Sequence, residues 1–212
     1  MGTQPSQHMG FRKEEIGEAL QDAINKGPIT KQYLADPFTI VRSLHRLRAT
    51  EITSHLQYKQ HAYMEVSLLS PGLTSEFEAY ARKKLQHADM LANRIQQLGG
   101  VPVFNLQELA GKAVSVDVRP EQETTLVVMM GEDLMLERRQ VEAYTALIRE
   151  IEDKDLVTRQ LLLDILQTTE QHASELADYL KRTCETLGTA RPDSVDRDKA
   201  QPNAYDNEGT RW

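Results

Sequence analysis

Two stretches of the chain carry the same spaced pair of acidic and histidine side chains. Glu51 is followed 36 positions later by His87, and Glu137 is followed 35 positions later by His172. Both stretches are rich in Leu, Ala, Glu, Gln and Arg, which favour helices. The pattern therefore predicts two copies of one helical hairpin, a repeat that brings two glutamates and two histidines into one shared interior.

Turn and capping signals divide the chain into helices. Gly27-Pro28 ends a short amphipathic helix, Asp36-Pro37 begins a long one, and Ser75 with Glu78 forms a capping box that predicts the start of the next. The expected helices cover residues 12–26, 37–70, 75–98, 123–152 and 156–188, with a long connection over residues 101–122. This arrangement predicts an all-α fold: an antiparallel four-helix bundle with one long crossover between its second and third helices.

The same signals predict three regions. Residues 1–36 form an N-terminal extension with its own short helix, and residues 37–188 form the bundle. Residues 189–212 are polar, contain Asp, Arg, Asn and Pro, and lack apolar periodicity, so they are expected to be a disordered tail.

Composition narrows the location and the partners. A net charge of −7 argues against a nucleic-acid partner, because such binding needs a basic face. No apolar run approaches the roughly 18 residues of a membrane span, and the N-terminus lacks the apolar core of a secretory signal. The single cysteine cannot form an internal disulfide. We therefore expect a cytoplasmic protein without a membrane partner.

The paired Glu and His residues point to metal chemistry. A carboxylate-bridged di-iron site in a four-helix bundle uses one Glu from each of two helices and a Glu-x-x-His pair from each of the other two. The candidate metal ligands here are Glu51, His87, Glu137 and His172.

The glutamate expected three residues before each histidine is absent. Lys84 precedes His87, and Thr169 precedes His172. Two inward-facing glutamates repel each other unless a positive charge or a proton compensates them. We interpret Lys84 as an internal counter-ion that replaces metal, with Thr169 as the second replaced position.

Three further side chains are expected beside these ligands. Tyr58 and Tyr144 each follow a candidate glutamate by seven residues, and His55 follows Glu51 by one helical turn. A metal-free polar core network is the alternative interpretation of the whole set.

The sequence resembles the bacterioferritin branch of the ferritin-like superfamily over about residues 44–187. The stretches that carry the resemblance are Ala49-Thr50-Glu51, Gln57-Tyr58 with His61, His87-Ala88-Asp89, Gly100-Val101-Pro102, Asn105–Leu109, Asp133–Glu137 and Ile165-Leu166 leading to His172. The resemblance implies a cage-forming protein that oxidises Fe(II) at a di-iron centre and stores the ferric product.

The departures from that family shape the functional expectation. Leu85 stands where bacterioferritins carry the haem-ligating methionine, so no haem is expected. The polar tail has no counterpart of the short fifth helix that helps close a cage. We expect an iron-binding storage protein with an impaired or absent ferroxidase centre, acting as a homo-oligomer of at least two chains or beside a catalytic ferritin-like subunit.

Two alternatives stay open from sequence alone. One is a ferritin-like metalloenzyme with an altered mononuclear or dinuclear site, and the other is a metal-free scaffold that acts through interactions. Whether the chain is an enzyme also stays open, because two of the four carboxylate ligands are missing.

Overall fold

The computed structural model describes residues 13–64, 71–113 and 125–189, and all regular structure in these ranges is helical. The helices are α1 (Lys13–Lys26), α2 (Pro37–Met64), α3 (Pro71–Gln97), α4 (Leu106–Lys112), α5 (Leu126–Ile151) and α6 (Leu156–Thr189). The all-α prediction is confirmed. Residues 190–212, which hold nearly all of the predicted tail, lie outside the described ranges.

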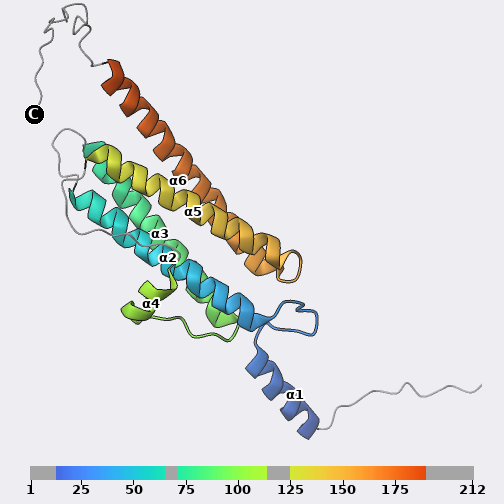
Figure 1. Cartoon of the computed structure of the whole chain (residues 1–212). Helices are drawn as coiled ribbons and strands as arrows, with labels where there is room; N and C mark the ends of the chain where they lie inside the picture. Colours follow the sequence, from blue (N-terminus) through green and yellow to red (C-terminus); the bar gives the residue numbers. More distant parts are fainter. Residues whose placement is uncertain (1–12, 65–70, 114–124, 190–212) are drawn as a thin grey trace, which may run out of the picture.

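The four long helices form two hairpins that pack into one bundle (Figure 1). α2 lies along α3, and α5 lies along α6. The hairpins meet where α2 contacts α5 and where α3 contacts α6. The connection between α3 and α5 carries α4, which contacts α2. This is the bundle with one long crossover that the repeat predicted.

One helix boundary and one short helix differ from the sequence-based expectation. α3 begins at Pro71, so the prediction that Ser75 starts this helix was wrong. Proline is pre-organised for a first helical turn, which places Ser75 one turn inside. The short helix α4 was not predicted. Its signal was Asn105, whose side chain accepts hydrogen bonds from the backbone N–H groups of Gln107 and Glu108.

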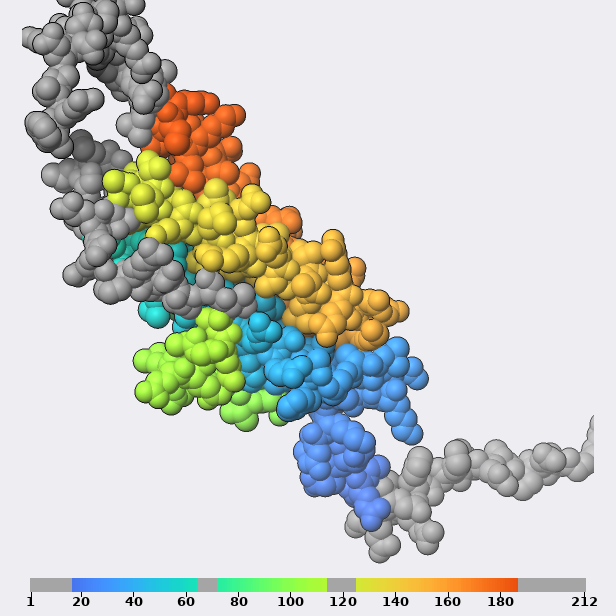
Figure 2. Space-filling model, in the orientation of Figure 1, coloured from blue at the N-terminus to red at the C-terminus, as the bar shows by residue number. Residues whose placement is uncertain are grey.

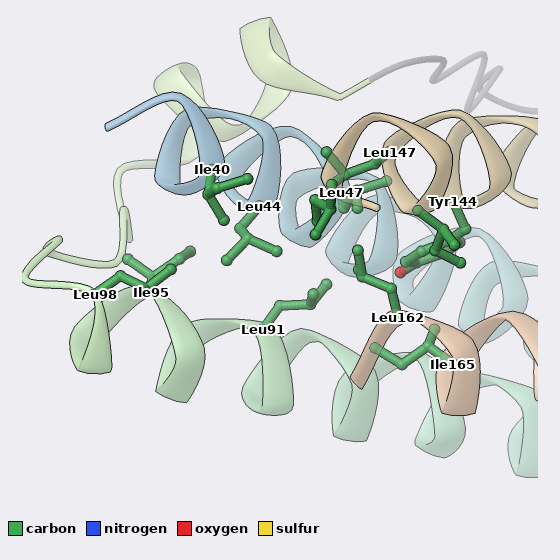
Figure 3. Packing of buried hydrophobic residues seen from close by; sticks show 12 residues of the cluster. Ile40, Leu44, Leu47, Leu91, Ile95, Leu98, Tyr144, Leu147, Leu162 and Ile165 are labelled. Atoms are coloured by element: carbon green, nitrogen blue, oxygen red, sulfur yellow. The ribbon is translucent and has the colours of Figure 1, made fainter. Parts of the chain in front are cut away.

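Two apolar clusters fill the bundle interior, one toward each end. The first lies near the α5–α6 turn and contains Ile40, Leu44, Leu47, Leu91, Ile95, Leu98, Tyr144, Leu147, Ile148, Ile151, Leu162 and Ile165. The side chains of this cluster that are labelled in Figure 3 point toward one another. The second lies toward the other end and contains Tyr58, Ala62, Phe77, Tyr80, Ala81, Met130 and Leu176. Residues 51, 84, 137 and 169, all buried, lie between these clusters along their helices and form a polar layer.

A buried ion pair joins α3 to the start of α6. Arg94 Nη2 lies 2.8 Å from Asp155 Oδ1, and Arg94 Nε donates to Thr158 Oγ1 at 2.7 Å. Tyr33, in the segment before α2, donates its hydroxyl to Asp155 Oδ2 at 2.8 Å. Asp155 also accepts from the Thr158 backbone N–H and so caps α6. These contacts tie the N-terminal segment to both hairpins.

α1 stands apart from the bundle in Figure 1. Leu20 and Ile24, on one face of α1, are exposed. Among the helices that the structure describes, none combines the length and the apolar character needed to cross a membrane.

We predict that Arg94→Met lowers the free energy of unfolding by about 2–4 kcal/mol, because it leaves the Asp155 carboxylate buried without its cation. Urea denaturation at pH 7 measures this loss. Lys26→Met is the control, since the Lys26–Asp22 pair is exposed and contributes under about 1 kcal/mol. Equal losses in the two variants would contradict the structural importance of the buried pair.

The same carboxylate predicts an acid sensitivity. Burial alone would raise the pKa of Asp155, but hydrogen bonds from Thr158, Tyr33 and Arg94 lower it below its usual value. Stability from this group is therefore present above the unfolded-state pKa of about 3.9 and is lost as the pH falls through the folded-state value. Asp155→Asn should flatten this part of the acid unfolding curve, which circular dichroism between pH 2 and 6 would reveal.

Candidate functional site

The four predicted ligand residues meet in the middle of the bundle, one from each long helix. Glu51 lies on α2, His87 on α3, Glu137 on α5 and His172 on α6, and all four are buried. His87 Nδ1 lies 3.4 Å from Glu51 Oε2, and His172 Nδ1 lies 3.4 Å from Glu137 Oε1. The two hairpins thus contribute equivalent Glu–His pairs, as the sequence repeat predicted.

Two tyrosines cross between the hairpins to these glutamates. Tyr144 on α5 donates its hydroxyl to Glu51 Oε1 at 2.7 Å, and Tyr58 on α2 donates to Glu137 Oε1 at 2.7 Å. The pKa of each tyrosine lies well above its usual value, first because of burial and then because of the neighbouring carboxylate. Both phenols therefore stay protonated and act as hydrogen-bond donors.

Lys84 occupies the interior of the site. Its side chain is fully buried, with Nζ 2.6 Å from Glu137 Oε2 and 3.9 Å from Glu51 Oε2. Nζ also donates to Gln140 Oε1 at 2.6 Å. The ammonium therefore lies against both carboxylates instead of extending to solvent.

The symmetry between the hairpins breaks at two pairs of equivalent positions, Lys84 with Thr169 and Ser54 with Gln140. Thr169, the counterpart of Lys84, is buried and donates to its own helix at the Ile165 carbonyl oxygen, 2.9 Å away. Ser54 and Gln140 stand three residues after the two glutamates, and Gln140 Nε2 donates to Ser54 Oγ at 2.5 Å. Lys84 and Gln140 are thus long where their counterparts in the other hairpin, Thr169 and Ser54, are short.

Electrostatics favour ionised Glu137 despite its burial. Burial alone would raise the pKa of this carboxyl, but the Lys84 ammonium and His172 outweigh burial and lower the pKa below its usual value. Glu137 accepts hydrogen bonds from Lys84 and Tyr58, so both of its oxygens are partnered. The Lys84–Glu137 pair is accordingly a fully buried, hydrogen-bonded ion pair.

Three polar atoms of the site lack hydrogen-bond partners. Glu51 Oε2, His87 Nδ1 and His172 Nδ1 are buried and make no hydrogen bond in the described part of the chain. Across residues 13–64, 71–113 and 125–189, however, no three His, Cys, Asp or Glu side chains group so that they could hold a metal ion. Two of these atoms, on Glu51 and His87, lie close to each other, and the third belongs to His172 on the other hairpin.

His55 lies away from this cluster. Its half-buried ring contacts the Ala81 carbonyl oxygen through Nδ1 at 2.8 Å, so it fixes α2 to the α3 backbone. The expectation that His55 faces the site is not supported by this contact. A residue one turn after Glu51 can face either the site or the neighbouring helix α3, and the His55 side chain faces α3.

A second buried polar group lies one turn before Glu137 on α5. Asp133 accepts from Gln57 Nε2 at 2.7 Å, and its other oxygen lies 2.8 Å from His61 Nδ1. Burial raises the pKa of Asp133, although His61 opposes the shift. Gln57, His61 and Asp133 each stand in a stretch that carries the family resemblance, but the contacts among them were not predicted. The signal was that Gln57, His61 and Asp133 are polar at positions where the other hairpin carries apolar residues.

The family assignment follows from the match of the whole bundle. The Ferritin family model, a ferritin-like domain, matches residues 41–185, which span all four long helices. The chain belongs to the ferritin-like family. The predicted resemblance to the ferritin-like superfamily is thereby confirmed.

Individual relatives agree with this assignment. The bacterioferritin of Desulfovibrio desulfuricans is 25% identical over 134 residues, covering 63% of this chain and 69% of that relative. A bacterioferritin-related protein of Bacteroides fragilis, a dodecameric thioferritin, superimposes with a TM-score of 0.67 at 22% identity, covering 82% of this chain and 99% of that one. The X-ray structure of the D. desulfuricans bacterioferritin, which describes a di-iron site, gives a TM-score of 0.61 at 21% identity, with coverages of 72% and 83%.

We predict that Lys84→Met destabilises the bundle by about 3–5 kcal/mol, because Glu137 and Glu51 then remain buried without a cation. The double variant Lys84→Met/Glu137→Gln should recover much of this loss, since it removes the uncompensated charge as well. Urea unfolding of the wild type, both single variants and the double variant measures the coupling. Strictly additive losses would show that Lys84 and Glu137 do not stabilise each other.

Proposed function

We propose that this chain is a storage-type member of the ferritin-like family that takes part in iron handling, although its own bundle neither holds a di-iron centre nor oxidises iron. The observation that carries the proposal is the fully buried Lys84 ammonium, 2.6 Å from Glu137 and 3.9 Å from Glu51. A fixed positive charge at this point repels a metal cation and already compensates the carboxylates that a cation would need.

The donor set supports the same inference. A di-iron centre in this kind of bundle uses four carboxylates and two imidazoles, whereas Lys84 and Thr169 replace two of the carboxylates here. One oxygen of each remaining glutamate accepts a tyrosine hydroxyl. We infer that the residues present do not fit a di-iron centre.

The relatives support a role in iron handling within an assembly. The matched curated relative is a bacterioferritin, and the Bacteroides fragilis neighbour is dodecameric. We propose that this chain forms a homo-oligomer of at least two copies or assembles as a non-catalytic subunit with a competent ferritin-like chain. The cytoplasmic location predicted from composition is part of this proposal.

One observation favours a second candidate. Glu51 Oε2 and His87 Nδ1 lie 3.4 Å apart, and neither has a hydrogen-bond partner among the described residues. A carboxylate oxygen and an imidazole nitrogen are ligands that iron or zinc accepts. The second candidate is thus an altered mononuclear site, for which Lys84 would have to move aside.

Anaerobic Fe(II) titration of the metal-stripped protein, followed by exposure to air, tests the first proposal. We predict less than one iron bound per wild-type chain and slow oxidation. Lys84→Glu/Thr169→Glu should bind about two irons per chain and oxidise them faster, because it restores both Glu-x-x-His pairs. Without metal, this variant should be less stable than the wild type, since four carboxylates then share the interior.

The matched control is Lys83→Glu/Thr168→Glu. It makes the same chemical changes one residue earlier on each helix, at positions that are only half-buried and face away from the polar layer. It should behave as the wild type does. Two irons bound and rapidly oxidised by the wild type would overturn the proposal, and one tightly bound iron would favour the mononuclear candidate.

A further inference from the structure

A groove lies on the outside of the bundle, between the first half of α2 and the helix α4. Its volume is about 600 Å³, within the range of small-molecule sites. It is lined by Phe38, Val41, Arg42, His45, Arg46, Gly111, Lys112 and Ala113. None of these residues belongs to the buried polar layer, so the groove is separate from the candidate metal site. Figure 2 shows α4, in green, against the surface of α2.

Side-chain contacts hold the α4 segment in place against α2. Arg48 donates through Nη1 to the Val103 carbonyl oxygen, and its guanidinium lies 4.6 Å from the centroid of the Phe104 ring. Asn105 then caps α4 through the Gln107 and Glu108 backbone N–H groups. The wall of the groove formed by Gly111, Lys112 and Ala113 therefore has a defined position.

The charge of the groove is opposite to that of the whole chain, whose net charge is −7. Arg42 and Arg46 are exposed and stand one helical turn apart on α2. Within residues 13–64, 71–113 and 125–189, neither arginine forms an ion pair with a carboxylate. Lys112, on the facing wall, pairs with Glu108 at 3.2 Å.

The half-buried imidazole of His45 lies among positively charged side chains, and they affect its pKa. Its pKa lies below the usual value, first because of burial and then because of Lys112 and Arg48, while Glu108 opposes them. Cationic groups thus outweigh acidic ones at this position. The exposed ring of Phe38 and the half-buried side chain of Val41 add an apolar surface beside the arginines.

We propose that this groove binds a small organic anion, a phosphate or carboxylate attached to an apolar body. Arg42 and Arg46 bind the anionic group, because a guanidinium matches the oxygens of carboxylates and phosphates in a two-bond geometry. Phe38 and Val41 contact the apolar body, as is typical of ligand sites that combine apolar walls with few charged groups. This binding does not depend on the proposed role in iron storage.

Isothermal titration calorimetry of the full chain with 1-naphthyl phosphate tests the proposal, with citrate and inorganic phosphate as companion probes. We expect saturable binding at one site per chain, and weaker binding of inorganic phosphate, which lacks the apolar body. Arg42→Gln/Arg46→Gln should weaken 1-naphthyl phosphate binding at least about tenfold, because hydrogen bonds to charged groups are lost. Tighter binding of citrate, which also lacks an apolar body, than of 1-naphthyl phosphate would contradict the proposed contacts with Phe38 and Val41.

The matched control is Arg138→Gln/Arg149→Gln, which removes the same charge from two exposed positions on α5. It should change the affinity less than twofold. Equal weakening by both double variants would overturn the proposal, because it would mean that net charge alone governs binding. Absence of saturable binding by all three probes would overturn it as well.

A fluorescence reporter locates the bound anion. Phe38→Trp in a Trp212→Phe background places the single tryptophan of the chain at the groove. Its emission should change on titration with phenyl phosphate, which does not share the emission range of tryptophan as naphthyl compounds do, with the same midpoint as a calorimetric titration of this same variant. Heat release without an emission change would place the ligand elsewhere and contradict the proposal.

Discussion

The bundle interior depends on one interaction, the contact of the Lys84 ammonium with two buried glutamates. A carboxylate taken out of water without a partner costs several kcal/mol, and two inward-facing carboxylates also repel each other. Lys84 Nζ lies 2.6 Å from Glu137 Oε2 and 3.9 Å from Glu51 Oε2, so one ammonium offsets both the desolvation of the carboxylates and their mutual repulsion. Because Lys84 comes from α3, Glu51 from α2 and Glu137 from α5, the ion pair also fixes how three helices lie along one another.

The proposed substitution of a lysine for metal involves more than one residue. A lysine side chain is longer than the glutamate it replaces, and its three N–H donors need acceptors. The Gln140 side-chain oxygen accepts one of them, and the Gln140 side-chain nitrogen donates to Ser54 Oγ. The short Thr169 side chain is buried at the position on α6 that corresponds to Lys84. At both pairs of equivalent positions a long side chain of one hairpin, Lys84 or Gln140, is matched by a short one of the other, Thr169 or Ser54. Changing Lys84 alone leaves Gln140 and Ser54 arranged for an ammonium, and changing both Lys84 and Thr169 to Glu restores the two Glu-x-x-His pairs but leaves Gln140 and Ser54 as they are.

Sequence reasoning reached the features that recur with a fixed period. The Glu–His repeat placed Glu51, His87, Glu137 and His172 in one interior. It failed where spatial packing decides between local alternatives. His55 has the spacing of an inward residue but faces the α3 backbone, and Ser75 has the spacing of a cap but follows a proline that starts the helix earlier. The contacts of Asp133 with His61 and Gln57 join helices far apart in sequence, so spacing along one helix did not reveal them.

An internal lysine also changes how folding depends on metal. In a bundle whose interior holds four carboxylates, metal binding contributes to the free energy of folding, and the metal-free form is strained by repulsion between like charges. A covalently attached ammonium is present whether or not iron is available. A ligand raises the free energy of unfolding only if it binds the folded state more tightly than the unfolded state. If this interior binds iron weakly, its free energy of unfolding should therefore change little with iron concentration. An interior of this kind would keep its shape when iron is scarce, as the proposed role of a non-catalytic subunit requires.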